Sequence, residues 1–223
     1  MYSLAEENYL KALYLLSGDV GTVSVNDLSK HLNIKMPTVN SMMKKLFDKG
    51  LIVYEVYKPI KLTALGKKEA ALILRKHRLT EMYLVQEMGF GWEEVHAIAE
   101  QIEHIDAPAF FDRMDALLGY PKADPHGSPI PNKQGEIEWI AYTKLTDCHV
   151  GDNVKLAAVT NSSDDFLKYL NSKNIKLGDS ISIIGIEAYD GSMQLAIANR
   201  QPDNFSKIVC EKLLVLPAED LVT

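Results

Sequence analysis

The stretch VNDLSKHLNIKMPTVNSMMKKLFDKGLI, residues 25–52, has the dimensions of a helix-turn-helix. Residues 25–32 predict a short helix, and Asn33 begins a tight turn after it. Pro37 stands where the first turn of a second helix tolerates a proline, and Gly50 is typical of the residue that follows a helix end. Two short helices joined by such a turn allow the second to lie in the major groove of DNA.

Two β-rich segments follow, LIVYEVY at residues 51–57 and IKLTAL at residues 60–65. The Lys-Pro dipeptide between them predicts a turn. Two antiparallel strands directly after a helix-turn-helix form a wing. Because an amphipathic helix is also expected at residues 4–17, residues 1–64 are predicted to be a winged helix-turn-helix DNA-binding domain.

The exposed side of the second helix and the tip of the wing carry side chains suited to DNA. Ser, Thr and Asn can hydrogen-bond base edges or phosphates, and Lys can neutralise phosphates. The candidate DNA-binding residues are Pro37, Thr38, Asn40, Ser41, Lys44, Lys45 and Lys58. Two alternatives stay open, a plain pair of packed helices and a winged helix that binds protein.

The charge is distributed unevenly along the 223 residues. Residues 1–68 hold 10 Lys and Arg against 6 Asp and Glu, a balance of +4, whereas the remainder holds 14 against 24, a balance of −10. The basic part could face phosphates and the acidic part could hold cations. The hydrophobic fraction of 47% is ordinary for a globular protein.

The cysteines and the N-terminus indicate the compartment. Cys148 and Cys210 are too few for a disulfide framework and form no C-x-x-C motif, which disfavours a thiolate zinc site. No basic leader precedes the first apolar stretch, and no apolar run approaches the roughly 20 residues that span a bilayer. We therefore expect a cytoplasmic protein without a membrane segment.

The middle of the chain carries His and Glu at helical spacing. The set comprises Glu100, Glu103 and His104 on one helix, His96 one turn earlier, and the i, i+4 pair His77 and Glu81 on the preceding helix. Side chains at this spacing share a face, and two antiparallel helices would bring the sets together. Buried carboxylates require a compensating cation. Nitrogen and oxygen donors without thiolate suit Mn²⁺ or Fe²⁺, although Zn²⁺ and Co²⁺ could bind the same set.

Three alternatives to a metal sensor remain at this point. A single Glu-x-x-Glu-His is usually a solvated helix face. A metallohydrolase could use the same cluster, and Asp147-Cys148-His149 could supply a thiol, but its position predicts a turn. A metal-buffering or interaction protein would bind metal without selecting DNA.

The rest of the chain completes an α+β fold. Helices are expected over about residues 63–88, 93–105 and 106–119, and strands interrupted by one helix, DDFLKYLNSK, follow a Pro- and Gly-rich stretch. The predicted domains are 1–64, a helical metal-binding and dimerisation domain at 65–119, a linker at 120–143 and a small SH3-like β-barrel at 144–223.

The ordered segments EENYLKALYLL, VNDLSKHL, MPTVNSMMKKLFDKGLI, LTALGKKEA, KHRLTEMYL and EVHAIAEQIEH resemble the diphtheria toxin repressor and manganese transport regulator family. The resemblance runs across about residues 4–115. PHGSPIP and the β module resemble the longer members, which carry an SH3-like (FeoA-type) domain. The resemblance implies a homodimeric repressor, not an enzyme, that binds palindromic operators and represses metal-uptake genes when loaded with Mn²⁺ or Fe²⁺.

The resemblance also implies ligands. The primary set is Asn8, Glu100, Glu103 and His104, the ancillary set is His77, Glu81, His96 and Asp165, and His126 and Asp124 are weaker candidates. His77 matches a position that short manganese-type members use in their metal pair and three-domain members use in the ancillary site. Up to two metal ions per subunit are therefore expected.

Two positions bear on the metal. Iron-type members have Cys where this chain has Glu100 and Met where it has Asn8, whereas manganese-type members have Glu and Asp. Glu100 thus favours Mn²⁺ with Fe²⁺ as the alternative, and Asn8 departs from both patterns. Metal is expected to fix the DNA-binding domain against a dimer core, for which the candidate surface is Ile98, Ile102, Phe110, Phe111 and Met114.

Overall fold

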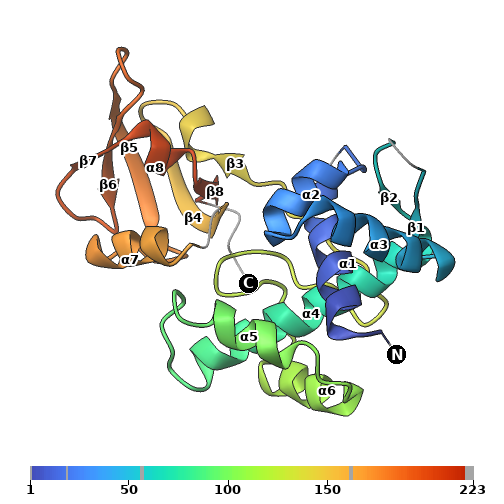
Figure 1. Ribbon diagram of the computed structural model, residues 1–223. Coiled ribbons are helices and arrows are strands. Elements are labelled where there is room, and N and C mark those ends of the chain that lie inside the picture. Colours follow the sequence, from blue (N-terminus) through green and yellow to red (C-terminus); the bar gives the residue numbers. More distant parts are fainter. Residues whose placement is uncertain (1, 19, 56–57, 161–162, 219–223) are drawn as a thin grey trace. The chain divides into compact units, whose positions relative to one another are not determined.

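The computed structural model describes residues 2–18, 20–55, 58–160 and 163–218. The chain forms two compact units (Figure 1). The first comprises Met1–Thr80, Ile98–Lys122 and Ile130–Glu138, and the second comprises Glu81–Ala97, Ala123–Pro129 and Trp139–Thr223. None of the helices that the described residues form is both long enough and apolar enough to cross a membrane.

The first unit begins with helices α1 (Leu4–Ser17), α2 (Val25–Leu32) and α3 (Met36–Asp48). The side chains of Ser3 and Ser24 cap α1 and α2, and Asn33 ends α2 in the left-handed conformation, with φ of 53°. A short polar side chain tolerates this conformation, so α3 can begin directly after the turn. The predicted helix-turn-helix is confirmed.

The wing is shorter than the sequence pattern indicates. Strands β1 (Ile52–Val53) and β2 (Lys61–Leu62) pair antiparallel, and Val23 bridges to Ile60 beside them. The part of the predicted first strand at residues 56–57 lies outside the described residues. Side chains from α1, α2, α3 and both strands form one core, including Leu10, Leu28, Met43, Leu46 and Ile52.

Three further helices carry the residues with metal-ligand chemistry. They are α4 (Ala64–Gln86), α5 (His96–Ile102) and α6 (Pro108–Leu117). The predicted break between the helices over residues 63–88 and 93–105 is confirmed, but α5 is shorter at both ends than the predicted helix over residues 93–105. Glu103 and His104 therefore lie in the turn that follows α5.

The second unit contains a six-stranded antiparallel sheet in the order β3-β8-β4-β5-β6-β7. Its strands are β3 (Thr143–Lys144), β4 (Asn153–Val159), β5 (Ser180–Ile186), β6 (Met193–Ile197), β7 (Asp203–Phe205) and β8 (Leu213–Pro217). A 3₁₀ turn, η1 (Leu145–Asp147), and helices α7 (Asp164–Ser172) and α8 (Lys207–Cys210) accompany them.

The sheet resembles an SH3-like fold, but the predicted closure into a barrel is wrong. The two end strands, β3 and β7, are not paired with each other among the described residues. They have 2 and 3 residues. Such short strands offer too few backbone groups to complete the hydrogen-bonded ring that a barrel requires.

The segment Ala123–Pro129 packs onto β4 although it is a turn with only an isolated bridge between its two ends. The backbone N–H of Val159 donates to the His126 carbonyl at 2.9 Å, and the Tyr142 hydroxyl donates to the Gly127 carbonyl at 2.8 Å. Burial raises the pKa of Tyr142. Gly127 has φ of 86°, and a Cβ there would lie 2.3 Å from the Ala157 carbonyl oxygen. Only glycine fits this close approach.

Gly127→Ala is therefore expected to lower the free energy of unfolding of the second unit by about 2–4 kcal/mol, because the clash adds to the strained φ. Gly151→Ala is the matched control, since Gly151 has φ of 95° and a Cβ there would meet none of the described atoms within 4 Å. It should cost only about 1–2 kcal/mol from the backbone conformation. Urea unfolding measures both, and equal losses would contradict the packing.

Candidate metal centre and DNA-binding face

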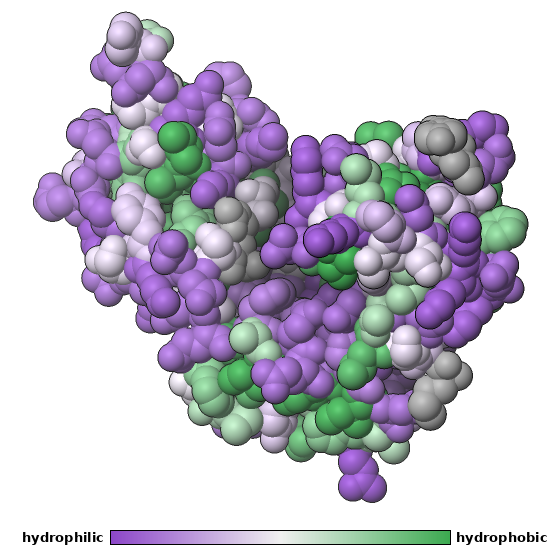
Figure 2. Space-filling view, in the orientation of Figure 1, coloured by the Kyte–Doolittle hydropathy of each residue, from purple (hydrophilic) through white to green (hydrophobic). Residues whose placement is uncertain are grey.

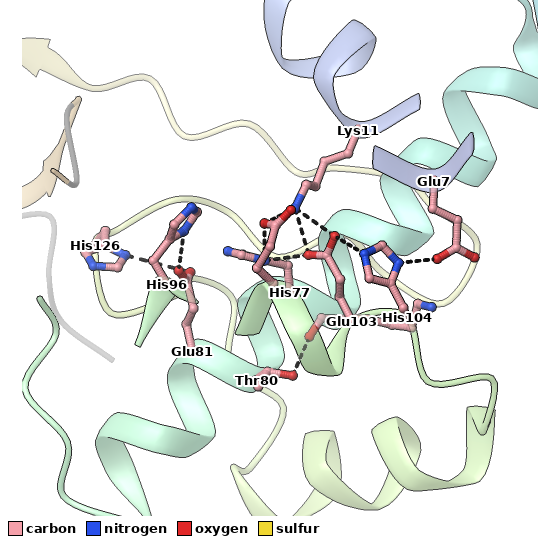
Figure 3. A network of polar contacts seen from close by, with 11 residues as sticks. Glu7, Lys11, His77, Thr80, Glu81, His96, Glu103, His104 and His126 are labelled. Atoms are coloured by element: carbon pink, nitrogen blue, oxygen red, sulfur yellow. Dashed lines mark hydrogen bonds and ion pairs between the residues drawn. The ribbon is translucent and has the colours of Figure 1, made fainter. Parts of the chain in front are cut away.

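Helix α1 and the first-unit parts of α4 and α5 bring polar side chains to one place (Figure 3). Glu7 and Lys11 come from α1, on which Asn8 follows Glu7; His77 comes from α4, and Glu100, Glu103 and His104 come from α5 and the turn after it. One potential ligand atom from each of the last three residues lies within 4.8 Å of the others. We call these seven residues the α1–α5 cluster.

Glu103 is the centre of the α1–α5 cluster. Its side chain is 0% exposed. Its Oε2 lies 2.5 Å from His77 Nδ1, and Lys11 Nζ lies 2.7 Å from Oε1 and 2.8 Å from Oε2. A buried carboxylate is retained only when it is paired and hydrogen-bonded, and these contacts supply that pairing.

His104 is oriented by a residue that the sequence analysis did not single out. Its Nδ1 lies 2.6 Å from Oε2 of Glu7, and its Nε2 lies 3.6 Å from Oε1 of Glu103. A carboxylate that binds one imidazole nitrogen fixes the ring and directs the other nitrogen to a metal. Glu7 is next to Asn8 in the chain, but its 97-residue separation from His104 left no local signal.

Asn8 provides an independent indication of a ligand. Its Oδ1 is buried and has no hydrogen-bond partner among the described residues. Leaving a buried acceptor unsatisfied costs about 1–3 kcal/mol, so such an atom requires an explanation. A divalent cation accepts amide oxygen, carboxylate oxygen and imidazole nitrogen together, and the residues present therefore fit a bound metal.

A second group of ligand-type side chains lies within the second unit. Potential ligand atoms of Glu81, Asp124 and His126 lie within 4.8 Å of one another, and all three residues are buried. His126 Nδ1 is 3.8 Å from Glu81 Oε2 and 3.9 Å from Asp124 Oδ1. We call this group the loop cluster, since two members lie in Ala123–Pro129.

The contacts of His126 define which nitrogen faces the carboxylates. His126 Nε2 lies 2.8 Å from the Trp92 carbonyl oxygen, to which it must donate its proton. The Nδ1 atom therefore faces Glu81 and Asp124, and it is the ring nitrogen positioned to bind a metal. The Trp92 ring stacks on the imidazole, with centroids 6.1 Å apart.

The other predicted ancillary residues are placed differently. His96 Nδ1 lies 3.3 Å from Glu81 Oε1, but the His96 side chain is 60% exposed. Asp165 is exposed in the first turn of α7 and belongs to neither cluster. The structure thus brings together Glu81, Asp124 and His126, the last two being residues that the sequence ranked lowest.

The second helix of the helix-turn-helix presents a polar face. Pro37, Thr38, Ser41, Lys44 and Lys45 are exposed on α3. Asn40 is half-buried, and its Oδ1 accepts a hydrogen bond from the Tyr54 hydroxyl at 3.1 Å. The Asn40 amide nitrogen is left as the group that can donate to a base edge.

The lysine at the tip of the wing pairs with a carboxylate of the wing itself. Lys58 lies 2.5 Å from Glu55 and both side chains are exposed. Because an exposed pair of this kind is weak, Lys58 can still turn toward a phosphate.

Apolar side chains gather on the surface over α5 and α6 (Figure 2). Of the predicted dimer residues, Phe110 is 45% exposed, whereas Phe111 and Met114 are buried in their own unit. The exposed apolar residues near Phe110 in sequence are Ile105, Leu117 and Tyr120. An exposed apolar patch of this kind is suited to a protein–protein interface.

The Asp147-Cys148-His149 segment does not provide an activated thiol. Burial and the nearby Asp152 raise the pKa of Cys148, which lowers the fraction of reactive thiolate. His149 Nδ1 instead lies 3.8 Å from Asp152. Cys210 is more deeply buried, with its pKa raised to about 12.

A winged helix-turn-helix that shares a unit with clustered Glu, His and Asn donors defines a metal-dependent DNA-binding regulator. Two family models match the chain. They describe the N-terminal DNA binding domain of iron dependent repressors, at residues 1–60, and their metal binding and dimerisation domain, at residues 63–132. The chain belongs to this iron-dependent repressor family, whose members are transcriptional regulators and not enzymes.

Individual relatives agree with this assignment. The iron-dependent repressor IdeR of Mycobacterium leprae (strain TN) is 34% identical over 125 residues, 56% of this chain and 54% of the relative. The chain thus matches about half the length of such curated relatives. The family does not favour the metallohydrolase and metal-buffering alternatives.

Solved structures match over nearly the whole chain. A manganese-dependent transcriptional repressor in complex with manganese is 28% identical with a TM-score of 0.84, and the match covers 95% of this chain and 99% of that chain. ScaR with bound Zn²⁺ is 31% identical with a TM-score of 0.75 and the same coverage.

Replacing Asn8 with the similarly sized Leu tests whether the buried amide lowers the stability of the metal-free protein. Asn8→Leu is expected to stabilise the metal-free protein by about 1–2 kcal/mol, because the unsatisfied acceptor is removed. Thermal unfolding in chelator measures this change. A loss of stability would show that the Asn8 amide already has a favourable partner in the metal-free state.

Proposed function

We propose that the chain is a homodimeric repressor that binds palindromic operator DNA when loaded with Mn²⁺ and switches off metal-uptake genes. Fe²⁺ is the alternative metal. One observation carries the proposal: the α1–α5 cluster takes donors from α1, which packs within the DNA-binding domain, and from α5, which belongs to the dimerisation domain. Metal occupancy and the position of the DNA-binding domain are thereby coupled.

Asn8, Glu100, Glu103 and His104 would hold the primary metal. A bound divalent cation would neutralise the carboxylates with its two positive charges. It would also bind the amide oxygen and the imidazole nitrogen, which come from separate helices. Glu7 holds the His104 ring in place, and His77 hydrogen-bonds Glu103. The His77 contact orients the Glu103 carboxylate without any part of α1, whereas the Glu7 contact ties α1 to His104, so a metal bound here acts directly on the position of α1.

The loop cluster is the proposed second site. Glu81, Asp124 and His126 supply two carboxylates and one imidazole, with His96 next to Glu81. Asp124 Oδ1 accepts hydrogen bonds from the backbone N–H groups of His126 and Ser128 at 2.8 and 3.0 Å, which fixes the carboxylate orientation. Two metal ions per subunit follow from two such sets, and Asp165 is not required for either.

Mn²⁺ is favoured by the donor chemistry. Neither cluster contains a thiolate, and carboxylate oxygens outnumber imidazoles in both. Hard oxygen donors suit Mn²⁺, whereas a sulfur ligand would shift preference toward softer metals. A solved relative is a manganese-dependent repressor in complex with manganese, which supports the same choice.

DNA binding would then follow by a shift in populations. A metal that binds better when α1 lies against α5 raises the fraction of molecules in that arrangement. In a dimer held through the apolar surface over α5 and α6, this arrangement sets the spacing of the two α3 helices against the DNA repeat. Thr38, Asn40 and Ser41 would read base edges, and Lys44, Lys45 and Lys58 would contact phosphates.

Glu103→Gln tests the coupling between metal and DNA. The variant keeps the size of the side chain but removes the central negative charge, so the metal-dependent gain in operator affinity, roughly 5–150-fold for typical allosteric coupling, should disappear. The measurement is fluorescence anisotropy of affinity-selected genomic fragments at fixed salt, with chelator-stripped protein and with Mn²⁺ or Fe²⁺. Glu138→Gln, at a carboxylate that is 82% exposed, is the control. Intact metal dependence in Glu103→Gln would refute the proposed site.

The α3 face is tested separately with metal saturating. Asn40→Ala should cost about 1–3 kcal/mol of operator affinity and relax base preference at one position, because a base-edge donor is lost. Lys44→Ala should weaken binding to all sequences and reduce the slope of log K against log salt by about 1. Lys168→Ala, exposed on α7, is the control. Unchanged affinity in both α3 variants would move the DNA contact elsewhere.

A further inference from the structure

The Lys11 ammonium lies inside the α1–α5 cluster and not in solvent (Figure 3). Its Nζ is 2.6 Å from Glu100 Oε2, 2.7 Å from Glu103 Oε1 and 2.8 Å from Glu103 Oε2. The Lys11 side chain is only 10% exposed. An ammonium has three donors, and all three are directed to carboxylate oxygens here.

These oxygens belong to the residues proposed to hold the primary metal. A lone pair that accepts a short hydrogen bond from an ammonium is not available to a metal at the same time. Burying a lysine is costly unless carboxylates compensate it, and Glu100 and Glu103 provide that compensation. The Lys11 ammonium thus occupies the carboxylates that are proposed to bind the metal ion.

Asn8 differs from Lys11 in its hydrogen bonding. Asn8 and Lys11 are three residues apart on α1 and therefore on one face of the helix. Lys11 is fully paired, whereas Asn8 Oδ1 has no partner among the described residues. One turn of α1 thus carries both residues. Lys11 pairs with the carboxylates of Glu100 and Glu103, whereas Asn8 Oδ1 remains without a partner in the described part of the chain.

We propose that Lys11 is a built-in competitor of the metal. In the metal-free protein its ammonium occupies the carboxylates of Glu100 and Glu103, and metal binding requires it to withdraw. The inference rests on the proposed function of the α1–α5 cluster. It adds that Lys11 sets the metal concentration at which this cluster binds the metal. Exchange replaces one positive charge by two and satisfies Asn8, so only a divalent ion at sufficient concentration displaces Lys11.

The first test compares Mn²⁺ affinity among Lys11 variants by isothermal titration calorimetry on the full chain. Lys11→Met keeps the length of the side chain but not its charge, and it should bind Mn²⁺ at least about tenfold more tightly, because no buried ion pair must be broken. Lys11→Arg keeps the charge and should stay near the wild-type affinity. Lys49→Met is the control, since Lys49 pairs with Glu6 of α1 at 2.6 Å outside the cluster.

Thermal unfolding separates competition from a purely structural ion pair. In chelator, Lys11→Met should melt roughly 5 °C or more below the wild type, because Glu100 and Glu103 lose their counter-charge. With saturating Mn²⁺ most of that difference should vanish. A structural role alone would leave the difference the same with and without metal.

A measurement on the unmodified chain covers the case in which Lys11→Met does not fold. Residue-resolved labelling with an amine reagent, read by mass spectrometry, should find Lys11 protected in chelator and more reactive with Mn²⁺. Lys49 should label equally in both conditions. Equal or greater protection of Lys11 with Mn²⁺ would overturn the proposal.

The outcomes distinguish this inference from the proposed function. If the wild-type protein does not bind Mn²⁺, or if Glu103→Gln binds it equally well, the proposed metal site is wrong. The proposed role of Lys11 is then wrong as well. If Glu103→Gln does remove Mn²⁺ binding but Lys11→Met binds Mn²⁺ equally or more weakly, the site stands and the competitor is overturned.

Discussion

The buried carboxylate of Glu103 is the constraint on which the metal-binding part of the structure depends. With none of its side chain exposed, it is stable only because Lys11 of α1 and His77 of α4 reach it from outside its own segment. Removing one partner of such a group leaves an uncompensated charge, at a cost of about 3–5 kcal/mol. Glu103 therefore fixes where the first helix of the DNA-binding domain meets the helices of the dimerisation domain. The same electrostatic demand that holds the first unit together makes this place attractive to a divalent cation.

The sequence predicts those parts of the fold that depend on local chemistry. Asn33, Pro37 and Gly50 place the turn and the ends of the helices of the helix-turn-helix, because each conformation is restricted to few residue types. The i, i+3, i+4 spacing of Glu100, Glu103 and His104 identified a shared face even though α5 ends before the last two. The donors are still gathered because the backbone N–H of Glu103 donates to the Ala99 carbonyl at 2.9 Å, which keeps the helical spacing one residue beyond α5.

What the sequence does not predict depends on long-range contacts. Glu7 and Lys11 reach residues 97 and 89 positions away, and no local period records such a contact. Barrel closure failed as a prediction because alternation identifies strands but not whether the end strands are long enough to pair. His126 looked like a linker residue, yet the Trp92 carbonyl and the close approach of Gly127 to β4 bury it with its lone pair toward Glu81.

The charges of the α1–α5 cluster also explain why a neutral Asn at position 8 is compatible with metal binding. Glu100 and Glu103 already supply two negative charges, and Glu7 adds a third through His104. Another carboxylate on the same face of α1 would raise repulsion in the metal-free state, where Lys11 offers a single positive charge. An amide keeps an oxygen donor without adding charge. The pair of Asn8 and Lys11 thus keeps the metal-free state closer to electrical balance than a carboxylate would. The amide oxygen of Asn8 remains without a hydrogen-bond partner among the described residues in the metal-free state. A metal that binds this oxygen would therefore stabilise the metal-bound state relative to the metal-free state.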